Sequence, residues 1–240
     1  MSYLSRNAES RFSLNPTNLD ISRSRFDRTS TLKTSFNVGE LIPFYIDEVL
    51  PGDTFDVSCA KVVRMQPMVS QPMDDLFLDT YFFFVPNRLV WDHWVNLMGE
   101  NTTSAWYPQV EYSVPQVNAP ADTGWQIGTL ADYFGIPIGV SGFSVNALPF
   151  RCYTKIVNDW FRDQNIVRPL YGYTGDSTLD GTNADAVDNY SATDLGGKPF
   201  IAAKYHDYFT SCLPAPQKGP DVQIGSSSFS LPVLSLARLP

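Results

Sequence analysis

The chain has 240 residues, of which 43% are hydrophobic and 14% aromatic, and its net charge is -8. This length is enough for one large domain or two small ones, and the apolar content is ordinary for a globular protein with a packed core. No apolar stretch approaches the roughly 20 residues that span a bilayer, which excludes a membrane-spanning helix. The polar stretch from Met1 to Asp20 also lacks the apolar centre of a secretory signal.

The cysteine and proline content narrows the structural class of the protein further. Three cysteines at wide spacings, Cys59, Cys152 and Cys212, favour free buried thiols in a reducing compartment over a disulfide framework. The 18 prolines outnumber the 15 glycines, and long periodic helices are few. We therefore expect a loop-rich chain that is mostly β.

Charge is distributed unevenly along the chain. Residues 1–33 hold six basic and three acidic side chains, a balance of +3, whereas residues 34–240 hold eleven basic and 22 acidic ones, a balance of -11. Residues 1–30 are polar and lack apolar periodicity, so we expect a basic arm that is extended or disordered. It could contact the phosphates of a nucleic acid, or be a solvated or partner-docking arm, and the sequence leaves both open. The candidate nucleic-acid-binding residues are Arg23, Arg25, Arg28 and Lys33.

The body of the chain, residues 31–240, begins with strand-like patterns. Apolar and polar residues alternate around Phe36, and the strand pattern of residues 31–65 is interrupted by the turn signal Pro51-Gly52-Asp53. Residues 75–85 are too aromatic for an exposed strand, and we expect them to form a buried one.

Three helices are predicted in the middle of the chain. The first covers residues 87–98 and ends at Gly99, with an apolar face formed by Trp91, Trp94, Val95 and Met98. A short second helix follows a capping box at Thr129. The third covers residues 148–163, with an apolar stripe formed by Tyr153, Ile156, Val157 and Trp160. At helical spacing these aromatic residues indicate core or subunit packing rather than a ligand site, and the candidate packing residues are Trp91, Trp94, Tyr153 and Trp160.

Motifs for catalysis or metal binding are weak. The only histidines, His93 and His206, lie in no known nucleophile or zinc motif, so we expect no catalytic residue. Residues 172–198 form an Asp- and Gly-rich loop, in which Asp176 to Gly181 resembles the start of a calcium loop. Its twelfth position is Val187 instead of the required Glu, so a plain loop is the better interpretation. No metal or cofactor is expected.

Several motifs resemble one known family when they are taken together and in order. They are RFD at 25–27, LPGDTF at 50–55, DTYFFFVPNRLVW at 79–91, WVNLMGE at 94–100, LADYFGIP at 130–137, NDWFRDQN at 158–165 and YFTSCLP at 208–214. The chain thereby resembles the major capsid proteins of the gokushoviruses, small single-stranded DNA phages of the microvirus family. The resemblance extends from about residue 20 to about residue 220, and no clear match follows from about Gly225.

This resemblance carries several expectations. It implies an all-β viral jelly roll, an antiparallel β-sandwich with helical insertions, that is incomplete here because such proteins are considerably longer. It implies a homo-oligomeric T=1 icosahedral shell around a single-stranded DNA genome, built together with other phage structural proteins and open to a host surface receptor. The protein would be assembled in the bacterial cytoplasm, reside in the virion, insert into no membrane and catalyse no reaction.

Two other classes of protein fit the sequence patterns less fully. A jelly-roll module for carbohydrate binding or host attachment would share the fold, and glycan binding by the monomer would distinguish it. A hydrolase would need paired carboxylates on facing strands, and the sequence does not pair Asp74, Asp75 or Asp207 with a partner.

Overall fold

The computed structural model describes residues 22–101, 110–185, 193–209, 211–213 and 219. The chain divides into two compact units, Met1–Lys33 and Thr34–Pro240. In the first unit, residues 22–33 are exposed and have neither helix nor strand. Thr29 Oγ1 there donates a hydrogen bond to Asp27 Oδ1 at 2.7 Å.

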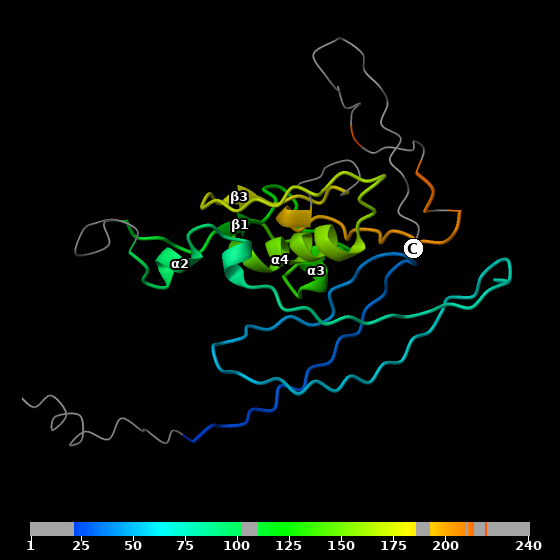
Figure 1. Cartoon of the computed structure of the whole chain (residues 1–240), viewed down its shortest axis with the longest axis horizontal. Coiled ribbons are helices and arrows are strands. Elements are labelled where there is room, and N and C mark those ends of the chain that lie inside the picture. Colours follow the sequence, from blue (N-terminus) through cyan, green and yellow to red (C-terminus); the bar gives the residue numbers. More distant parts are fainter. Residues whose placement is uncertain (1–21, 102–109, 186–192, 210, 214–218, 220–240) are drawn as a thin grey trace, which may run out of the picture. The chain divides into compact units, whose positions relative to one another are not determined.

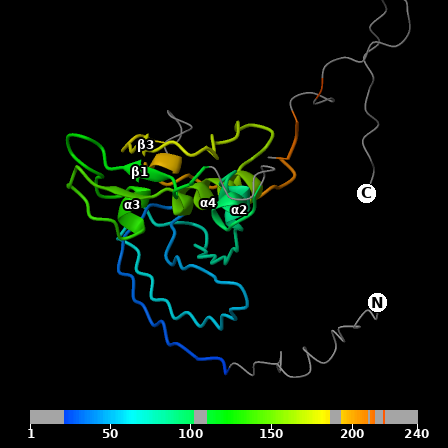
Figure 2. The ribbon, with the colours of Figure 1, turned by 90° about the vertical axis from the view of Figure 1, so that its left-hand side faces the viewer.

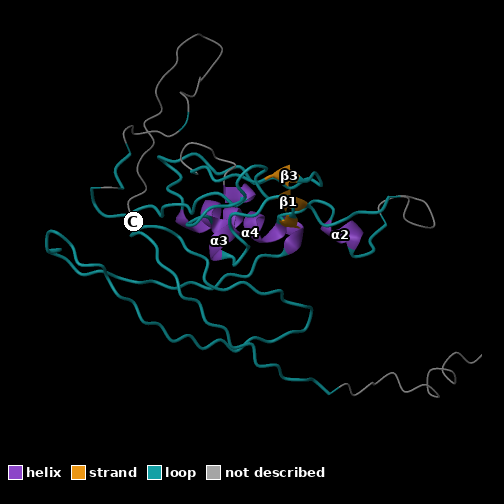
Figure 3. Cartoon of the chain, turned by 180° about the vertical axis from the view of Figure 1, so that it is seen from behind, coloured by secondary structure: helices purple, strands orange, loops and turns teal. Residues whose placement is uncertain are grey.

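Helix α4 (Leu148–Ile156) lies at the centre of the helices of the second unit, with the small sheet on one side and α3 on the other (Figures 1 and 3). Ala147 is the N-cap of the helix, and the side-chain oxygen of Asn146 accepts the Leu148 N–H at 2.9 Å, which satisfies one of the unpaired N–H groups at the helix start. The helix continues as a π-helix, η2 (Val157–Phe161), in which Arg162 N donates to Val157 O at 3.0 Å. The predicted helix over 148–163 is thus confirmed to within two residues of its C-terminal end.

The π-helix changes which residues face the core. Val157 is buried as the stripe predicts, but Trp160 is 72% exposed. A π turn needs more residues than the 3.6 of an α turn, so it rotates Trp160 away from the stripe that begins at Tyr153. The prediction that Trp160 continues this stripe is therefore wrong.

The sheet is small and mixed. Its central strand β1 (Gln116–Asn118) pairs antiparallel with β2 (Ser144–Asn146) and parallel with β3 (Leu179–Asp180). The fold class observed in the described residues is therefore a small mixed sheet with few helices, which is compatible with a capsid β fold.

Helix α3 (Leu130–Tyr133) is short, as predicted, and Thr129 caps it. Thr129 Oγ1 accepts the Asp132 N–H at 3.4 Å, and Asp132 Oδ2 accepts the Gly128 N–H at 2.9 Å. Gly135 ends the helix with a φ of 78°, a left-handed conformation that favours glycine.

Two clusters of buried side chains form the core. The larger one lies between α3, α4 and the sheet and contains Val117, Trp125, Leu130, Phe150, Val157 and Phe200. The smaller one contains Val90, Trp91 and Leu148, with Trp94 and Leu97 packed against it. Figures 1 and 2 show α3, α4 and the sheet close together, in agreement with the larger cluster.

The helix predicted over 87–98 is interrupted. It consists of a 3-10 helix, η1 (Asn87–Leu89), and one turn of α-helix, α2 (Trp94–Leu97), so a single continuous helix is wrong. The break has a physical cause: Asp92 N donates to Thr174 O at 3.1 Å instead of to a carbonyl of its own helix. Gly99 follows α2 with a φ of 102°, as expected of a helix end.

The strand-like segments of residues 31–65 and 75–85 differ most from the prediction. In the described residues they are extended but belong to no strand, apart from an isolated bridge between Glu40 and Ile201 (Figure 3). Phe77 is 82% exposed and Phe84 70%, so the prediction of a buried strand is wrong for this structure. A strand needs a partner for its backbone, and no described residues pair with 75–85.

The loop predicted over 172–198 contains two short elements within its described part. These are β3 and a 3-10 helix, η3 (Thr193–Leu195). The side chains of Thr193 and Asp194 in η3 are buried, because η3 packs against α4.

Candidate functional site

Four aromatic side chains gather where residues 81–83 meet the π-helix, and we call them the aromatic patch: Tyr81, Phe83, Trp160 and Phe161. The ring of Phe161 lies edge-on to Tyr81 and Phe83, with centroid distances of 5.4 and 5.8 Å. Trp160 lies 5.9 Å from Phe83. Tyr81 and Phe83 stack on each other at 6.2 Å. The cluster therefore joins a segment early in the chain to the end of the central helix.

The aromatic patch is open to solvent although it is apolar. Trp160 is largely exposed, and Tyr81 is about half exposed. Beside the patch, Ala203 N donates to Phe161 O at 3.1 Å, and the Tyr205 hydroxyl binds the Asp79 carboxylate. The hydrogen bond to Asp79 raises the pKa of Tyr205. Exposed apolar surface of this kind is typical of sites where another protein surface binds.

The other candidate packing residues lie inside the chain or at its edge. Trp91 is fully buried, and its ring lies edge-on to that of Trp94, which is half-buried. Tyr153 is buried and donates its hydroxyl hydrogen to Leu41 O at 2.9 Å. The structure brings Trp91 and Trp94 together, whereas Tyr153 and Trp160 contribute to other surroundings. A role of these residues between subunits stays a prediction.

Residues 173–177 form a short segment that we call the strap, because it is bonded to several distant elements. At its C-terminal end, Asp176 accepts the Trp91 indole N–H at 2.7 Å and lies 2.8 Å from His93 Nδ1. In its middle, Thr174 O accepts the Asp92 N–H at 3.1 Å and Thr174 Oγ1 donates to Asp92 Oδ2 at 2.9 Å. The strap thus holds the residues that connect η1 and α2.

The N-terminal end of the strap meets η3 and α4. Asp194 Oδ2 accepts the Tyr173 N–H at 2.9 Å. Arg151 of α4 donates to Gly175 O at 3.0 Å and to Val90 O at 3.2 Å, and its guanidinium carbon lies 5.1 Å from the centre of the Tyr173 ring. Arg151 is 3% exposed and Asp194 2%, so this is a buried polar cluster.

Burial shifts the pKa values of Asp194 and Arg151. It raises the pKa of Asp194 to about 6, although the Tyr173 N–H and the Arg151 charge act in the opposite direction. Burial also lowers the pKa of Arg151, against the attraction of Asp194 and other nearby groups. For Asp176, burial opposes ionisation, but hydrogen bonds from Trp91 and His93 outweigh it and lower the pKa.

The structure also shows which contacts are made by the calcium-like motif and by His93. Asp176, the first residue of the calcium-like motif, is bonded to Trp91 and His93. Among the described residues, no group of three or more His, Cys, Asp or Glu side chains could hold a metal ion. The ring of His93 stacks on Tyr112 at a centroid distance of 4.3 Å. The arrangement indicates a structural role for His93 and Asp176.

The cysteines are free, but their burial differs from the prediction. Cys59 and Cys212 are exposed, and only Cys152 is partly buried. Burial raises the pKa of the Cys152 thiol to about 11, so this thiol stays protonated at neutral pH. The expectation of three buried thiols is therefore wrong for Cys59, which lies in an exposed segment outside any helix or strand, and for Cys212, which follows an exposed turn.

The candidate nucleic-acid-binding residues all lie in the first unit. Arg23, Arg25, Arg28 and Lys33 have exposed side chains in an extended segment. Exposure and positive charge suit contacts with phosphates. Nucleic-acid binding by these residues stays a prediction.

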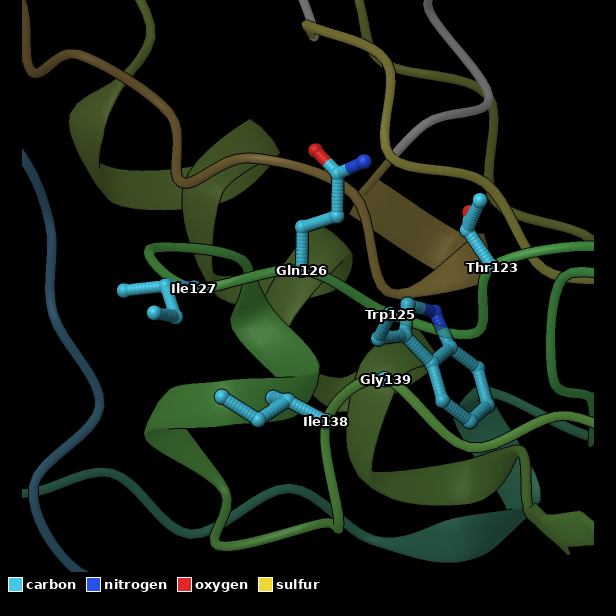
Figure 4. Close-up of a pocket in the computed structure, with 6 residues that line it drawn as sticks. All are labelled: Thr123, Trp125, Gln126, Ile127, Ile138 and Gly139. Carbon is cyan, nitrogen blue, oxygen red and sulfur yellow. The ribbon is translucent and has the colours of Figure 1, made fainter.

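A shallow hollow of about 520 Å³ lies beside Trp125 (Figure 4). Its lining residues are Thr123, Trp125, Gln126, Ile127, Ile138 and Gly139. None of them is ionisable, and Ile127 is largely exposed at the rim. The hollow therefore lacks the groups that acid–base or metal chemistry needs.

Sequence reasoning missed Arg151, Tyr173 and Asp194. The one signal for Arg151 is a charged residue between apolar positions near the start of the α4 stripe. Such a residue is exposed in most helices, so the sequence pattern alone does not single it out. Asp194 lies in a polar loop, and its burial depends on packing against α4.

A comparison with known families decides the class of this chain. The family model described as "Capsid protein (F protein)" matches residues 15–238. The chain belongs to this family. The resemblance stated from the sequence motifs is thereby confirmed.

Individual capsid proteins of bacteriophages show the same relationship. The chain is 46% identical to "Capsid protein VP1" of Spiroplasma virus 4 over 199 residues, which cover 83% of this chain and 35% of that protein. It is 42% identical to "Capsid protein VP1" of Chlamydia phage 1, covering 95% and 40%. It is also 42% identical to "Capsid protein VP1" of Bdellovibrio phage phiMH2K, covering 86% and 36%. This capsid-family chain thus spans between a third and two fifths of the length of these relatives.

In the described part of this capsid-family chain, no helix has the length and apolar character that crossing a membrane requires.

Proposed function

We propose that this chain is part of a structural capsid protein that assembles with copies of itself into an icosahedral shell. The family match over residues 15–238 is the observation that supports this proposal most directly. The exposed aromatic patch is a second support, because an apolar surface of this kind is stabilised when another subunit covers it. The role is structural, and we assign no catalytic residue.

The details of the shell follow from the resemblance to gokushovirus capsid proteins. We propose a T=1 shell that encloses a single-stranded DNA genome, with the complete protein folded as a jelly roll. The extended residues 42–85 would supply strands of that jelly roll once their backbone is paired. The protein would assemble in the bacterial cytoplasm with other phage structural proteins and reside in the virion. It would also present a surface to a host receptor.

We also propose a role for the basic arm. Residues 1–30 and the adjoining Lys33 would face the genome, with Arg23, Arg25, Arg28 and Lys33 at the phosphates, or the arm would tie neighbouring subunits together. The comparisons do not favour the alternative of a carbohydrate-binding module, since the three relatives named above are capsid proteins.

Electron microscopy and sedimentation of the complete capsid protein, expressed alone and with its phage partners, would test the proposal. We expect shells for the natural protein and a loss of shells for Trp160→Ala, because this change removes the largest exposed ring of the aromatic patch. Tyr171→Ala is the matched control: Tyr171 is also exposed but lies outside the patch. Monomers under all conditions would contradict assembly, and normal shells for Trp160→Ala would contradict the role of the patch.

A further inference from the structure

The aromatic patch, as the subunit contact proposed above, requires a complementary surface on a neighbouring copy. Around the fivefold and threefold axes of an icosahedral shell, each contact joins two different surfaces of neighbouring copies. The partner of the patch in such a contact is therefore another part of the same kind of chain. That part should be accessible, apolar and uncharged, because charged groups are depleted at the centre of protein interfaces.

The hollow beside Trp125 has these properties. None of the residues that line it is ionisable (Figure 4). Two isoleucines of its lining are accessible, since Ile127 is 81% exposed and Ile138 38%. Thr123 and Gln126 add uncharged polar groups. The hollow thus combines apolar walls with a few hydrogen-bonding groups, which is typical of pockets that take an apolar or aromatic group.

Bonds within the chain hold the walls of the hollow in place. Gly139 N donates to Trp125 O at 2.8 Å, which links the two segments that form the hollow. Trp125 is fully buried, and its indole N–H donates to Leu195 O at 3.2 Å. The side-chain oxygen of Asn183 accepts the Gln126 N–H at 2.9 Å. A preformed hollow loses little conformational freedom when it is filled, and this favours binding.

Trp160 is the member of the aromatic patch that best fits this hollow. It is 72% exposed, against 50% for Tyr81 and 38% for Phe83. A buried indole needs apolar surroundings for its ring and an acceptor for its N–H, and the side-chain oxygens of Thr123 and Gln126 can accept that hydrogen. The volume of about 520 Å³ lies in the range of pockets that hold molecules larger than an indole.

We propose that Trp160 of one copy inserts into the hollow beside Trp125 of the next copy in the assembled shell. This inference rests on the proposed function and adds which two surfaces meet. The contact is heterologous, because the patch and the hollow are different surfaces, and it can be repeated around a ring of copies. A tryptophan in a pocket is the kind of residue that contributes a large share of the binding free energy of an interface.

A charge at the rim of the hollow tests the contact from one side. We expect Ile127→Glu in the complete capsid protein to raise the concentration at which shells form by roughly tenfold or more, because assembly would bury a carboxylate against the indole. Ile166→Glu is the matched control, since Ile166 is 78% exposed and belongs neither to the patch nor to the hollow. Sedimentation measures assembly, and circular dichroism checks that both variants are folded. Normal assembly of Ile127→Glu would overturn the proposal.

Photo-crosslinking identifies the partner of position 160 directly. The variant Trp160→benzoylphenylalanine keeps a large aromatic side chain at this position, and mass spectrometry of the illuminated shells locates the new covalent bond. We expect a bond between two copies that joins position 160 to the peptide covering residues 123–139. A bond to the patch of the neighbouring copy, to another part of that copy or to a different phage protein would overturn this inference alone. Absence of shells for the natural protein would instead contradict the proposed function on which the inference rests.

Discussion

Arg151 links α4 to the strap and to Val90 through one buried guanidinium. We expect Arg151→Met to lower the free energy of unfolding by roughly 3 kcal/mol, because it leaves the buried Val90 carbonyl and the partly buried Gly175 carbonyl without this donor and removes the cation that attracts Asp194. Urea unfolding monitored by circular dichroism would measure the change. Lys198→Met is the control, since Lys198 is exposed and its loss should change stability little. An equal effect of both variants would show that the buried cluster contributes no more than a surface charge.

The raised pKa of Asp194 predicts how the stability of the folded chain depends on pH. Because burial raises its pKa from 3.8 to about 6, the folded chain binds a proton in this range that the unfolded chain has already lost. The stability contributed by this group therefore falls as the pH rises from about 4 to 6. We expect Asp194→Asn to raise the melting temperature at pH 7.5 and to have little effect at pH 4. Scanning calorimetry at both pH values would measure it, and a lower melting temperature at pH 7.5 would contradict the prediction.

At the scale of residues, the sequence predicts which apolar side chains are buried better than it predicts which polar side chains are buried. The helical spacing of Trp91 and Tyr153 indicated packing, and both are buried. The burial of Asp194 could not be predicted, because it depends on α4, more than 35 residues earlier in the chain. Periodicity reports which face of a helix is apolar, and it does not report which distant carboxylate lies against that face.

Among the elements, α3 depends on its capping residue. Thr129 Oγ1 accepts the Asp132 N–H and donates to Gln126 O at 2.8 Å. We expect Thr129→Ala to lower the free energy of unfolding by about 1 kcal/mol, a typical cost for the loss of such a cap. Thr129→Ser keeps the hydroxyl and should retain most of the stability. Chemical unfolding of the two variants compares them directly, and equal losses would mean that the Thr129 methyl group, rather than the hydroxyl, stabilises the helix.

The sequence predicted the existence of the helices more accurately than their continuity. The signals at Thr129, Gly135 and Gly99 are local, and each marks a helix end in the structure. The break between η1 and α2 arises from the bond between Asp92 N and Thr174 O, which joins residues 82 positions apart. A local pattern contains no information about such a partner.

On the scale of the whole molecule, the positive charge of the basic arm leads us to expect a salt-dependent affinity for single-stranded DNA. Arg23, Arg25 and Arg28 changed together to Ala should weaken binding and lower the slope of log affinity against log salt by up to about 2. Fluorescence anisotropy with a labelled oligonucleotide would measure this. The control variant also removes three positive charges, but it does so outside the arm, by changing the exposed residues Arg88, Lys198 and Lys204 to Ala. An unchanged slope in the arm variant would instead favour a protein-docking arm.

The strand-like segments show the limit of prediction at this scale. Alternation around Phe36 and the aromatic run of 75–85 indicate chain that is suited to a sheet. Whether a sheet forms depends on partners for the backbone, and no described residues pair with 75–85. The motifs nevertheless predicted the family, because they depend on residue identity along the chain and not on pairing.

The strap also affects the order in which the chain can fold during synthesis. Asp176, which accepts the indole hydrogen of Trp91, lies 85 residues later in the chain. A ribosome that adds 5–20 residues per second reaches it roughly 4–17 s after Trp91. During that interval the short helices around Trp91 lack the bonds that later hold them in place. A nascent chain that ends before residue 173 should therefore leave the Trp91 indole N–H without its acceptor, and translation speed sets how long this bond is missing.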